Sequence, residues 1–160
     1  MVVGATELFS TTNGEVIMTK QKNTAIDLFA DFAVDEALSQ DGVWVKYAGD
    51  VSFLIARAGN RNYRKVAQHL YQKHSRLLES KTDAANEKLT EIVIDAMAKG
   101  ILLGWKGDLQ FQGKPLPYSM ENARTLLKLE RLRDLIDGYS KDEQQFAAVQ
   151  EEEDEENLPV

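Results

Sequence analysis

The stretch from Gly100 to Ala123 constrains the fold of this chain more than any other. It carries four of the ten glycines and two of the three prolines, yet it also carries Trp105, Phe111 and Tyr118. A flexible linker has no use for large aromatic side chains, because it buries none of them. The two prolines exclude a helix until Ser119, which has the chemistry of a helix N-cap. We therefore predict a structured elbow, residues 100–123, between two helical segments.

Apolar residues recur at helical spacing on both sides of the elbow. From Asn60 to Ser80 they share one face of a predicted helix, and the basic residues fall mostly on the other face. A second helix is predicted to begin near Asp83, as its N-cap, and to end at Gly100 or Gly104. After the elbow, one or two further helices are predicted between residues 119 and 149.

Strands are predicted in two places. The β-rich runs Val43–Tyr47 and Val51–Ile55 flank a turn that contains Gly49, which predicts a β-hairpin. A single short strand is predicted inside the elbow, near Leu109–Phe111. The chain is therefore expected to combine one hairpin with several amphipathic helices.

Residues 1–40 are predicted to form a weakly determined N-terminal arm. They contain a turn signal at residues 11–14, and the apolar period that follows is too short to define a helix. Phe29, Phe32 and Val34 are expected to dock on the core.

These patterns predict an α+β fold, namely a mainly helical single domain with an N-terminal β-hairpin. At 160 residues the chain is long enough to bury one core of moderate size. We expect residues 41–150 to form this core. Residues 151–160 are expected to be an acidic disordered tail, since six adjacent carboxylates repel one another.

Charge is distributed unevenly along the chain. The net charge is −7, but the segment Arg57–Lys81 holds seven cations and one acid, whereas Glu130–Glu156 holds eleven acids and three cations. Six of those cations form a predicted electrostatic patch: Arg57, Arg61, Arg64, Lys65, Lys73 and Arg76. Such a patch could follow a phosphate backbone, but it is also common on a solvated helix face, so the pattern does not favour nucleic acid as a partner.

No motif predicts catalysis. The two histidines, His69 and His74, are five residues apart and so point in different directions on a helix, which does not suit a shared metal ion. The acidic row from Asp83 to Asp95 lies opposite the apolar stripe of its helix, where charged residues are expected in any case. We predict a protein that is not an enzyme and that needs no metal or cofactor.

The composition also bears on location. The chain has no cysteine, so no disulfide framework is expected, and its first residues have neither a basic region nor an apolar core typical of a signal peptide. These features predict a cytoplasmic protein that does not enter a membrane.

Two groups of motifs, taken in order, resemble the tail assembly chaperones of long-tailed bacteriophages. The first group lies around the predicted hairpin and comprises Phe32–Glu36, Asp41–Val45, Ile55–Arg57 and Asn60–Arg64. The second lies in and after the elbow and comprises Leu103–Gly107, Gly113–Ser119, Glu121–Ala123, Leu126–Leu127 and Leu132–Ile136. The resemblance extends over about residues 32 to 150.

This resemblance implies a non-catalytic protein of the host cell cytoplasm. In that family the protein binds the long tape measure protein, keeps it soluble and helps to recruit tail tube subunits, in part through a frameshifted form. It is expected to be absent from the mature virion. Two other functions stay open: a structural tail or neck component of the virion, and a small nucleic-acid-binding regulator. A homo-oligomer also stays open.

The elbow supplies the candidate partner-binding residues. We consider the hypothesis that its large apolar side chains are partly exposed and contact the client: Trp105, Leu109, Phe111, Leu116 and Tyr118. The alternative is that Trp44 and Trp105 are both core residues that join the hairpin to the helices. The sequence leaves both interpretations open.

Overall fold

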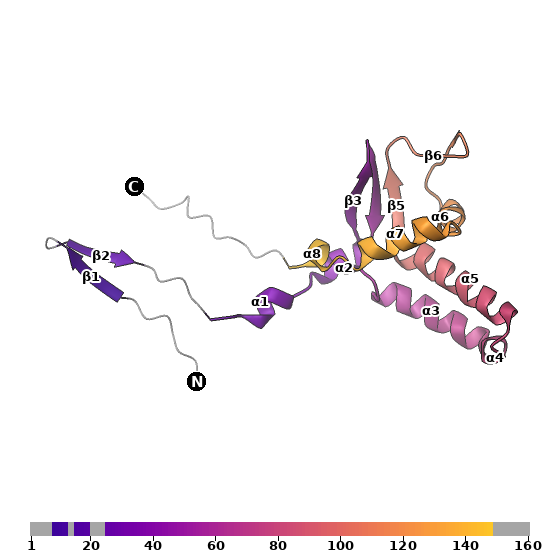
Figure 1. The fold of residues 1–160 in the computed structure, drawn as a ribbon, viewed down its shortest axis with the longest axis horizontal. Coiled ribbons are helices and arrows are strands. Elements are labelled where there is room, and N and C mark those ends of the chain that lie inside the picture. Colours follow the sequence, from indigo (N-terminus) through magenta and orange to yellow (C-terminus); the bar gives the residue numbers. More distant parts are fainter. Residues whose placement is uncertain (1–7, 13–14, 20–24, 149–160) are drawn as a thin grey trace. The chain divides into compact units, whose positions relative to one another are not determined.

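The computed structural model describes residues 8–12, 15–19 and 25–148, and the chain divides into two compact units, Met1–Phe32 and Ala33–Val160 (Figure 1). The predicted boundary after residue 40 falls inside the second unit. The predicted acidic tail at residues 151–160 lies outside the described residues. None of the described helices is long and apolar enough to span a membrane.

The first unit contains a β-hairpin and a short helix. Strand β1 (Leu8–Thr12) pairs antiparallel with β2 (Glu15–Thr19), and α1 follows at Leu28–Phe32. The turn signal at residues 11–14 lies where the two strands meet, but the strands themselves were not predicted. They are only five residues each, so neither carries a long enough apolar alternation to be recognised.

Phe29 and Phe32 lie on α1 in the first unit, with side chains 81% and 77% exposed. Their expected docking on the core of the second unit stays a prediction. A five-residue helix has no full apolar face, so the local pattern cannot say whether its rings turn inward. Val34 is half-buried. It forms an isolated antiparallel bridge with Ala147, and both residues belong to the second unit.

The second unit is built around a three-stranded antiparallel sheet. Its strand order is β3 (Val43–Ala48), β4 (Val51–Ile55), β5 (Leu102–Lys106), and Phe53 lies opposite Trp105. The predicted hairpin between β3 and β4 is confirmed. Strand β5 was not predicted, because its pairing partner lies about fifty residues earlier in the chain and no local pattern reports such a contact.

Two very short strands continue the elbow. Strand β6 (Gln110–Phe111) pairs antiparallel with β7 (Lys114–Pro115). The short strand expected near Leu109–Phe111 is therefore confirmed, and it belongs to a small hairpin of its own.

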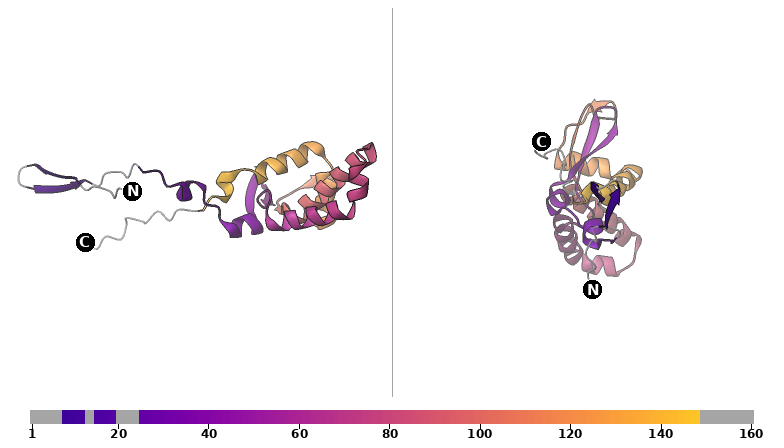
Figure 2. Two further views of the ribbon diagram at one scale, coloured as in Figure 1. Left: turned by 90° about the horizontal axis from the view of Figure 1, so that it is seen from below. Right: turned by 90° about the vertical axis from the view of Figure 1, so that its left-hand side faces the viewer.

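Seven helices are described in the second unit. They are α2 (Glu36–Asp41), α3 (Arg61–Lys73), α4 (Ser75–Glu79), α5 (Asp83–Gly100), α6 (Met120–Leu127), α7 (Glu130–Ser140) and α8 (Glu143–Phe146). Helices α3 and α5 lie side by side (Figure 2). The mainly helical α+β class is thereby confirmed.

The helix ends agree with the sequence in most places. Ser119 caps α6 by accepting a hydrogen bond from the Asn122 amide, as predicted, and α5 ends at Gly100. The N-cap of α5 is Thr82, which accepts from Ala85, and not Asp83. The helix predicted from 60 to 80 is divided into α3 and α4 at His74.

The core lies where the sheet meets the helices. Its buried cluster takes Phe53 and Ile55 from β4, Leu102 from β5, Leu127 from α6 and Ile136 from α7, together with one face of α5. This arrangement places the tip of the β3–β4 hairpin, the elbow and the α6–α7 junction near one another.

Candidate functional site

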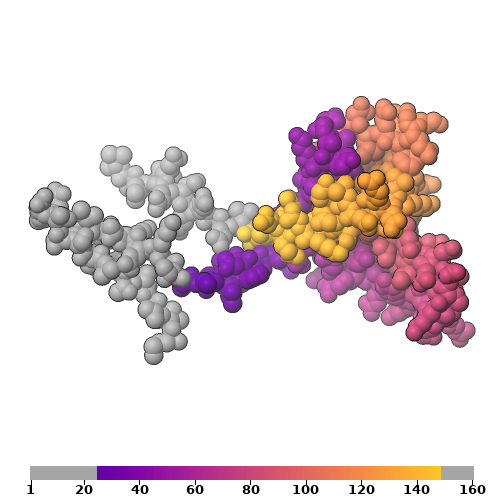
Figure 3. Space-filling model, viewed as in Figure 1, coloured from indigo at the N-terminus to yellow at the C-terminus, as the bar shows by residue number. Residues whose placement is uncertain are grey.

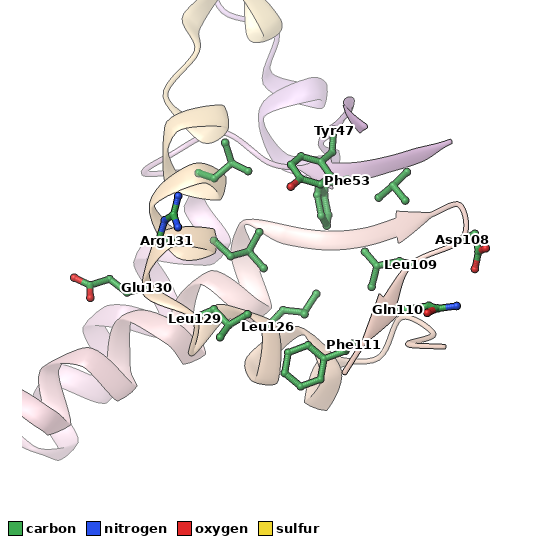
Figure 4. A pocket seen from close by; sticks show the side chains of 13 residues that line it. Tyr47, Phe53, Asp108, Leu109, Gln110, Phe111, Leu126, Leu129, Glu130 and Arg131 are labelled. Carbon is green, nitrogen blue, oxygen red and sulfur yellow. The ribbon is translucent and has the colours of Figure 1, made fainter. Parts of the chain in front are cut away.

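An apolar groove of about 970 Å³ lies between three segments that are far apart in the sequence (Figure 4). The hairpin contributes Tyr47, Val51 and Phe53, and the elbow contributes Asp108–Phe111. The α6–α7 region contributes Leu126, Leu129, Glu130, Arg131, Leu132 and Leu135. In the space-filling view the hairpin and the elbow rise on either side of this hollow (Figure 3).

Trp105 is buried and contacts both Leu116 and Tyr118 of the elbow. Its side chain is only 8% exposed, and its indole Nε1–H donates a hydrogen bond to the Leu116 carbonyl at 2.9 Å. The Tyr118 ring packs edge-on against it, with ring centroids 5.1 Å apart. The Leu116 amide in turn donates to the Leu109 carbonyl at 3.0 Å. Trp105 is therefore a core residue, and its position sets the shape of the elbow.

The two tryptophans do not share one role. Trp44 was considered as a second core residue, but it is 48% exposed on β3, with the Lys106 ammonium 4.3 Å from its ring centroid. Its ring lies beside Lys106 of β5, on the other side of β4 in the sheet. The alternative that both tryptophans join the hairpin to the helices thus applies to Trp105 only.

The groove brings together two of the five predicted partner-binding residues. Leu109 and Phe111 line it, and both are half-buried against the core. Leu116 is half-buried outside the groove lining, and Tyr118 stands against Trp105 with part of its ring exposed.

Sequence reasoning missed two residues at the groove rim. Tyr47 is 54% exposed and packs on the buried Phe53 ring, with centroids 5.8 Å apart. Leu129 is 48% exposed and occupies the N-cap position of α7, where its side chain forms no capping hydrogen bond. Serine, threonine, aspartate and asparagine are the residues preferred at that position, so a leucine there is a signal that could have marked the site.

The elbow is fastened to the hairpin tip at Asp50. The Asp108 amide donates to both carboxylate oxygens of Asp50, at 3.2 and 3.3 Å. Gly107, at φ +99°, approaches so closely that a β-carbon there would lie 2.4 Å from the Asp50 carbonyl oxygen. These contacts hold the hairpin wall and the elbow wall of the groove together.

The groove lining is suited to holding apolar groups. Its floor contains the buried side chains of Phe53 and Leu126, while Asp108, Glu130 and Arg131 supply charge of both signs. Apolar surface of this kind favours an apolar partner segment flanked by polar residues.

The predicted electrostatic patch is divided by the fold. Arg57 precedes α3, and its Nη2 donates to both carboxylate oxygens of Glu143, at 3.1 and 3.0 Å. It therefore serves to attach α8. The other five cations lie on α3 and α4 with exposed side chains, and none forms an ion pair with another described residue: Arg61, Arg64, Lys65, Lys73 and Arg76.

The acidic row on α5 is used partly for ion pairs. Glu91 accepts a hydrogen bond from Lys88 at 2.6 Å, which lowers the pKa of Glu91. Asp95 pairs with Arg124 of α6 at 2.7 Å. Over the part of the chain that the structure describes, no three histidine or acidic side chains gather as they would around a metal ion.

Comparison with known proteins gives one family. A family model described as YdaY prophage protein matches residues 58–157, which include α3, the elbow and the helices after it. No significant match is found among curated proteins or among solved structures.

Proposed function

The chain belongs to the YdaY prophage protein family, and from that premise we propose that it is a phage tail assembly chaperone. In this role it is non-catalytic, and it holds an apolar helical segment of the tape measure protein in the groove between the hairpin, the elbow and α7. It acts in the host cell cytoplasm and leaves the tail before the virion is complete.

The observation that carries this proposal is the apolar groove with exposed apolar side chains at its rim. Tyr47 and Leu129 keep about half of their surface in water beside a floor that is already apolar. Burying such side chains against a partner releases water from both surfaces and is favourable by about 25 cal/mol per Å². A partner helix can supply apolar anchors at i, i+3, i+4 and i+7 to fill the groove.

The prophage origin and the motif order support the choice of client. The residues that resemble tail assembly chaperones include Leu103–Gly107 and Gly113–Ser119, which flank the elbow residues that line the groove, Asp108–Phe111. A tape measure protein is long and helical, so it presents many amphipathic segments that need cover before the tube closes around it. A frameshifted form of the chaperone is proposed to recruit the tube subunits.

The experiment is co-expression with the tape measure protein of the same prophage. We expect the wild-type chain to keep that protein in the soluble extract and to co-purify with it. Tyr47→Ser and Leu129→Ser should each reduce the soluble, co-purifying amount, because each removes an apolar contact at the rim. Trp44→Ser is the matched control, since Trp44 is as exposed as Leu129 but lies outside the groove lining.

Two outcomes would contradict the proposal. If the tape measure protein is equally insoluble with and without the chain, the client is wrong. If Trp44→Ser reduces solubilisation as much as the rim variants do, the groove is not the binding site. A stoichiometric amount of the protein in purified virions would instead favour a structural tail or neck subunit.

A further inference from the structure

Helices α3 and α4 carry an exposed cationic surface, which we define as the basic face. Its members are Arg61, Arg64, Lys65, Lys73 and Arg76. On α3, Arg61, Arg64 and Lys65 point away from the half-buried Tyr63, Val66 and Leu70 and the buried Ala67, while Lys73 lies at the end of the helix, two turns after Val66. None of its five cations forms an ion pair with a residue that the structure describes.

A shallow hollow adds to the basic face. It has a volume of about 430 Å³, and its lining includes Lys65 and His69 of α3 and Lys99 of α5. Positive charge is thus concentrated on one side of a chain whose net charge is −7. Such a surface attracts anionic groups, and the nearest candidates lie in the same chain.

Helix α8 is held beside the segment that leads into α3. Phe146 of α8 is buried, and Glu143 of the same helix is bound by Arg57, four residues before Arg61. The Ala58 amide donates to the Ser140 carbonyl at 2.8 Å. The last described residues, Ala147 and Ala148, pair with Val34 and Ala33, so the chain leaves the described structure five residues after the contact between Arg57 and Glu143.

We infer that the acidic run Glu151–Glu156 docks on the basic face of its own chain. The run begins three residues after Ala148, a gap that can span about 10 Å at roughly 3.3 Å per residue. Six residues of run cover about 20 Å, which equals the length of a 13-residue helix at about 1.5 Å per residue. The six carboxylates are thus opposite in charge to the cations of α3, and the run is about as long as the helix.

The short connection between Ala148 and Glu151 favours docking of the chain's own acidic run over docking of the run of a second copy. A short connection gives an effective concentration in the millimolar range, which exceeds ordinary protein concentrations. Each exposed ion pair contributes little by itself, so docking depends on several pairs at once and weakens as salt is added. The docked run covers the cations of the basic face, so nucleic acid cannot bind to them. This inference does not depend on which client the groove binds.

The first test is carbodiimide cross-linking of the full chain at low salt, read by mass spectrometry. We expect amide cross-links from residues 151–156 to Lys65 and Lys73, and their loss at high salt. Lys46 and Lys114 are the controls, because they are exposed on other elements. Equal cross-linking of the control lysines, or no cross-link to the basic face, would overturn the inference. Mixing light and heavy isotope-labelled chains identifies a second copy, and mixed-label products would exclude docking within one chain.

The second test measures binding of a fluorescent single-stranded DNA at low salt. Neutralising all six acids of the run to Gln or Asn should tighten binding on the order of tenfold or more, since the basic face is then uncovered. Adding Lys65→Gln and Lys73→Gln should remove that gain. A charge-matched control neutralises six exposed acids elsewhere: Glu36, Asp41, Asp108, Glu121, Glu130 and Asp134. If this control tightens DNA binding equally, the effect is one of net charge and the docking inference is wrong.

Discussion

Gly100 has no β-carbon, and this allows helices α3 and α5 to pack closely. A β-carbon there would lie 2.7 Å from both the nitrogen and the Cα of Tyr63, so α3 and α5 cross in contact through their backbones. Asn60 locks the same crossing: its buried Nδ2 donates to the Gly100 carbonyl at 2.6 Å, and its Oδ1 accepts from the Tyr63 amide at 3.0 Å. Three residues therefore determine how closely the two long helices pack.

Gly100→Ala should be strongly destabilising. The added methyl group meets backbone atoms, which cannot rotate away, so the free energy of unfolding should fall by roughly 1–3 kcal/mol or more. Gly138→Ala in α7 is the control, because nothing lies within 4 Å of its β-carbon position and alanine favours a helix by up to about 1 kcal/mol. Urea unfolding of both variants checks this. Equal losses would mean that the close helix crossing is not a constraint.

At the scale of elements, the α6–α7 junction departs from the pattern of its neighbours. The side chains of Asp35, Asn60, Thr82, Ser119 and Asp142 all cap helices by accepting a backbone hydrogen bond. Leu129 at the start of α7 does not, and it extends over the groove instead. A cap that would stabilise α7 has been replaced by apolar surface at the candidate site, which is the usual mark of a functional position.

Leu129→Ser should therefore separate stability from client binding. A serine can cap α7, so the free energy of unfolding should stay unchanged or rise by up to about 1 kcal/mol, while solubilisation of the client falls. Ser119→Ala is the reciprocal control: it removes the α6 cap and should lower stability by about 1 kcal/mol without affecting the client. Chemical unfolding and the co-expression assay measure the two effects. Parallel losses of stability and binding in both variants would contradict a binding role for Leu129.

For the whole molecule, the main core belongs to the second unit alone. Its buried cluster runs from Phe53 to Ile136, all within that unit. The bridge between Val34 and Ala147 also lies within the second unit. These features indicate that residues 33–160 contain what they need to fold.

Removal of residues 1–32 should leave the fold of the remainder intact. We expect its Tm to lie within about 4 °C of the full chain, the shift that about 1 kcal/mol produces in a domain of this size. Thermal unfolding followed by circular dichroism provides the measurement. A much larger drop would show that the first unit stabilises the second.

The candidate site could be predicted only in part. Leu109 and Phe111, two of the predicted partner-binding residues, line the groove, and their contact with a client stays a prediction. Tyr47 and Leu129 were missed, since they lie outside the elbow, Tyr47 about fifty residues before Gly100 and Leu129 about six residues after Ala123. No periodicity within one segment reports which distant segments will face it.

The sequence by itself determined the local features of this protein. The cap at Ser119, the end of α5 at Gly100 and the β3–β4 hairpin all depend on hydrogen bonds and turn geometry within a few residues, so the local residue types suffice. Only the tertiary structure decided that Trp105 is buried while Trp44 is exposed, and that β5 joins the sheet. Burial depends on which remote surfaces meet, and that is settled by the packing of the whole core.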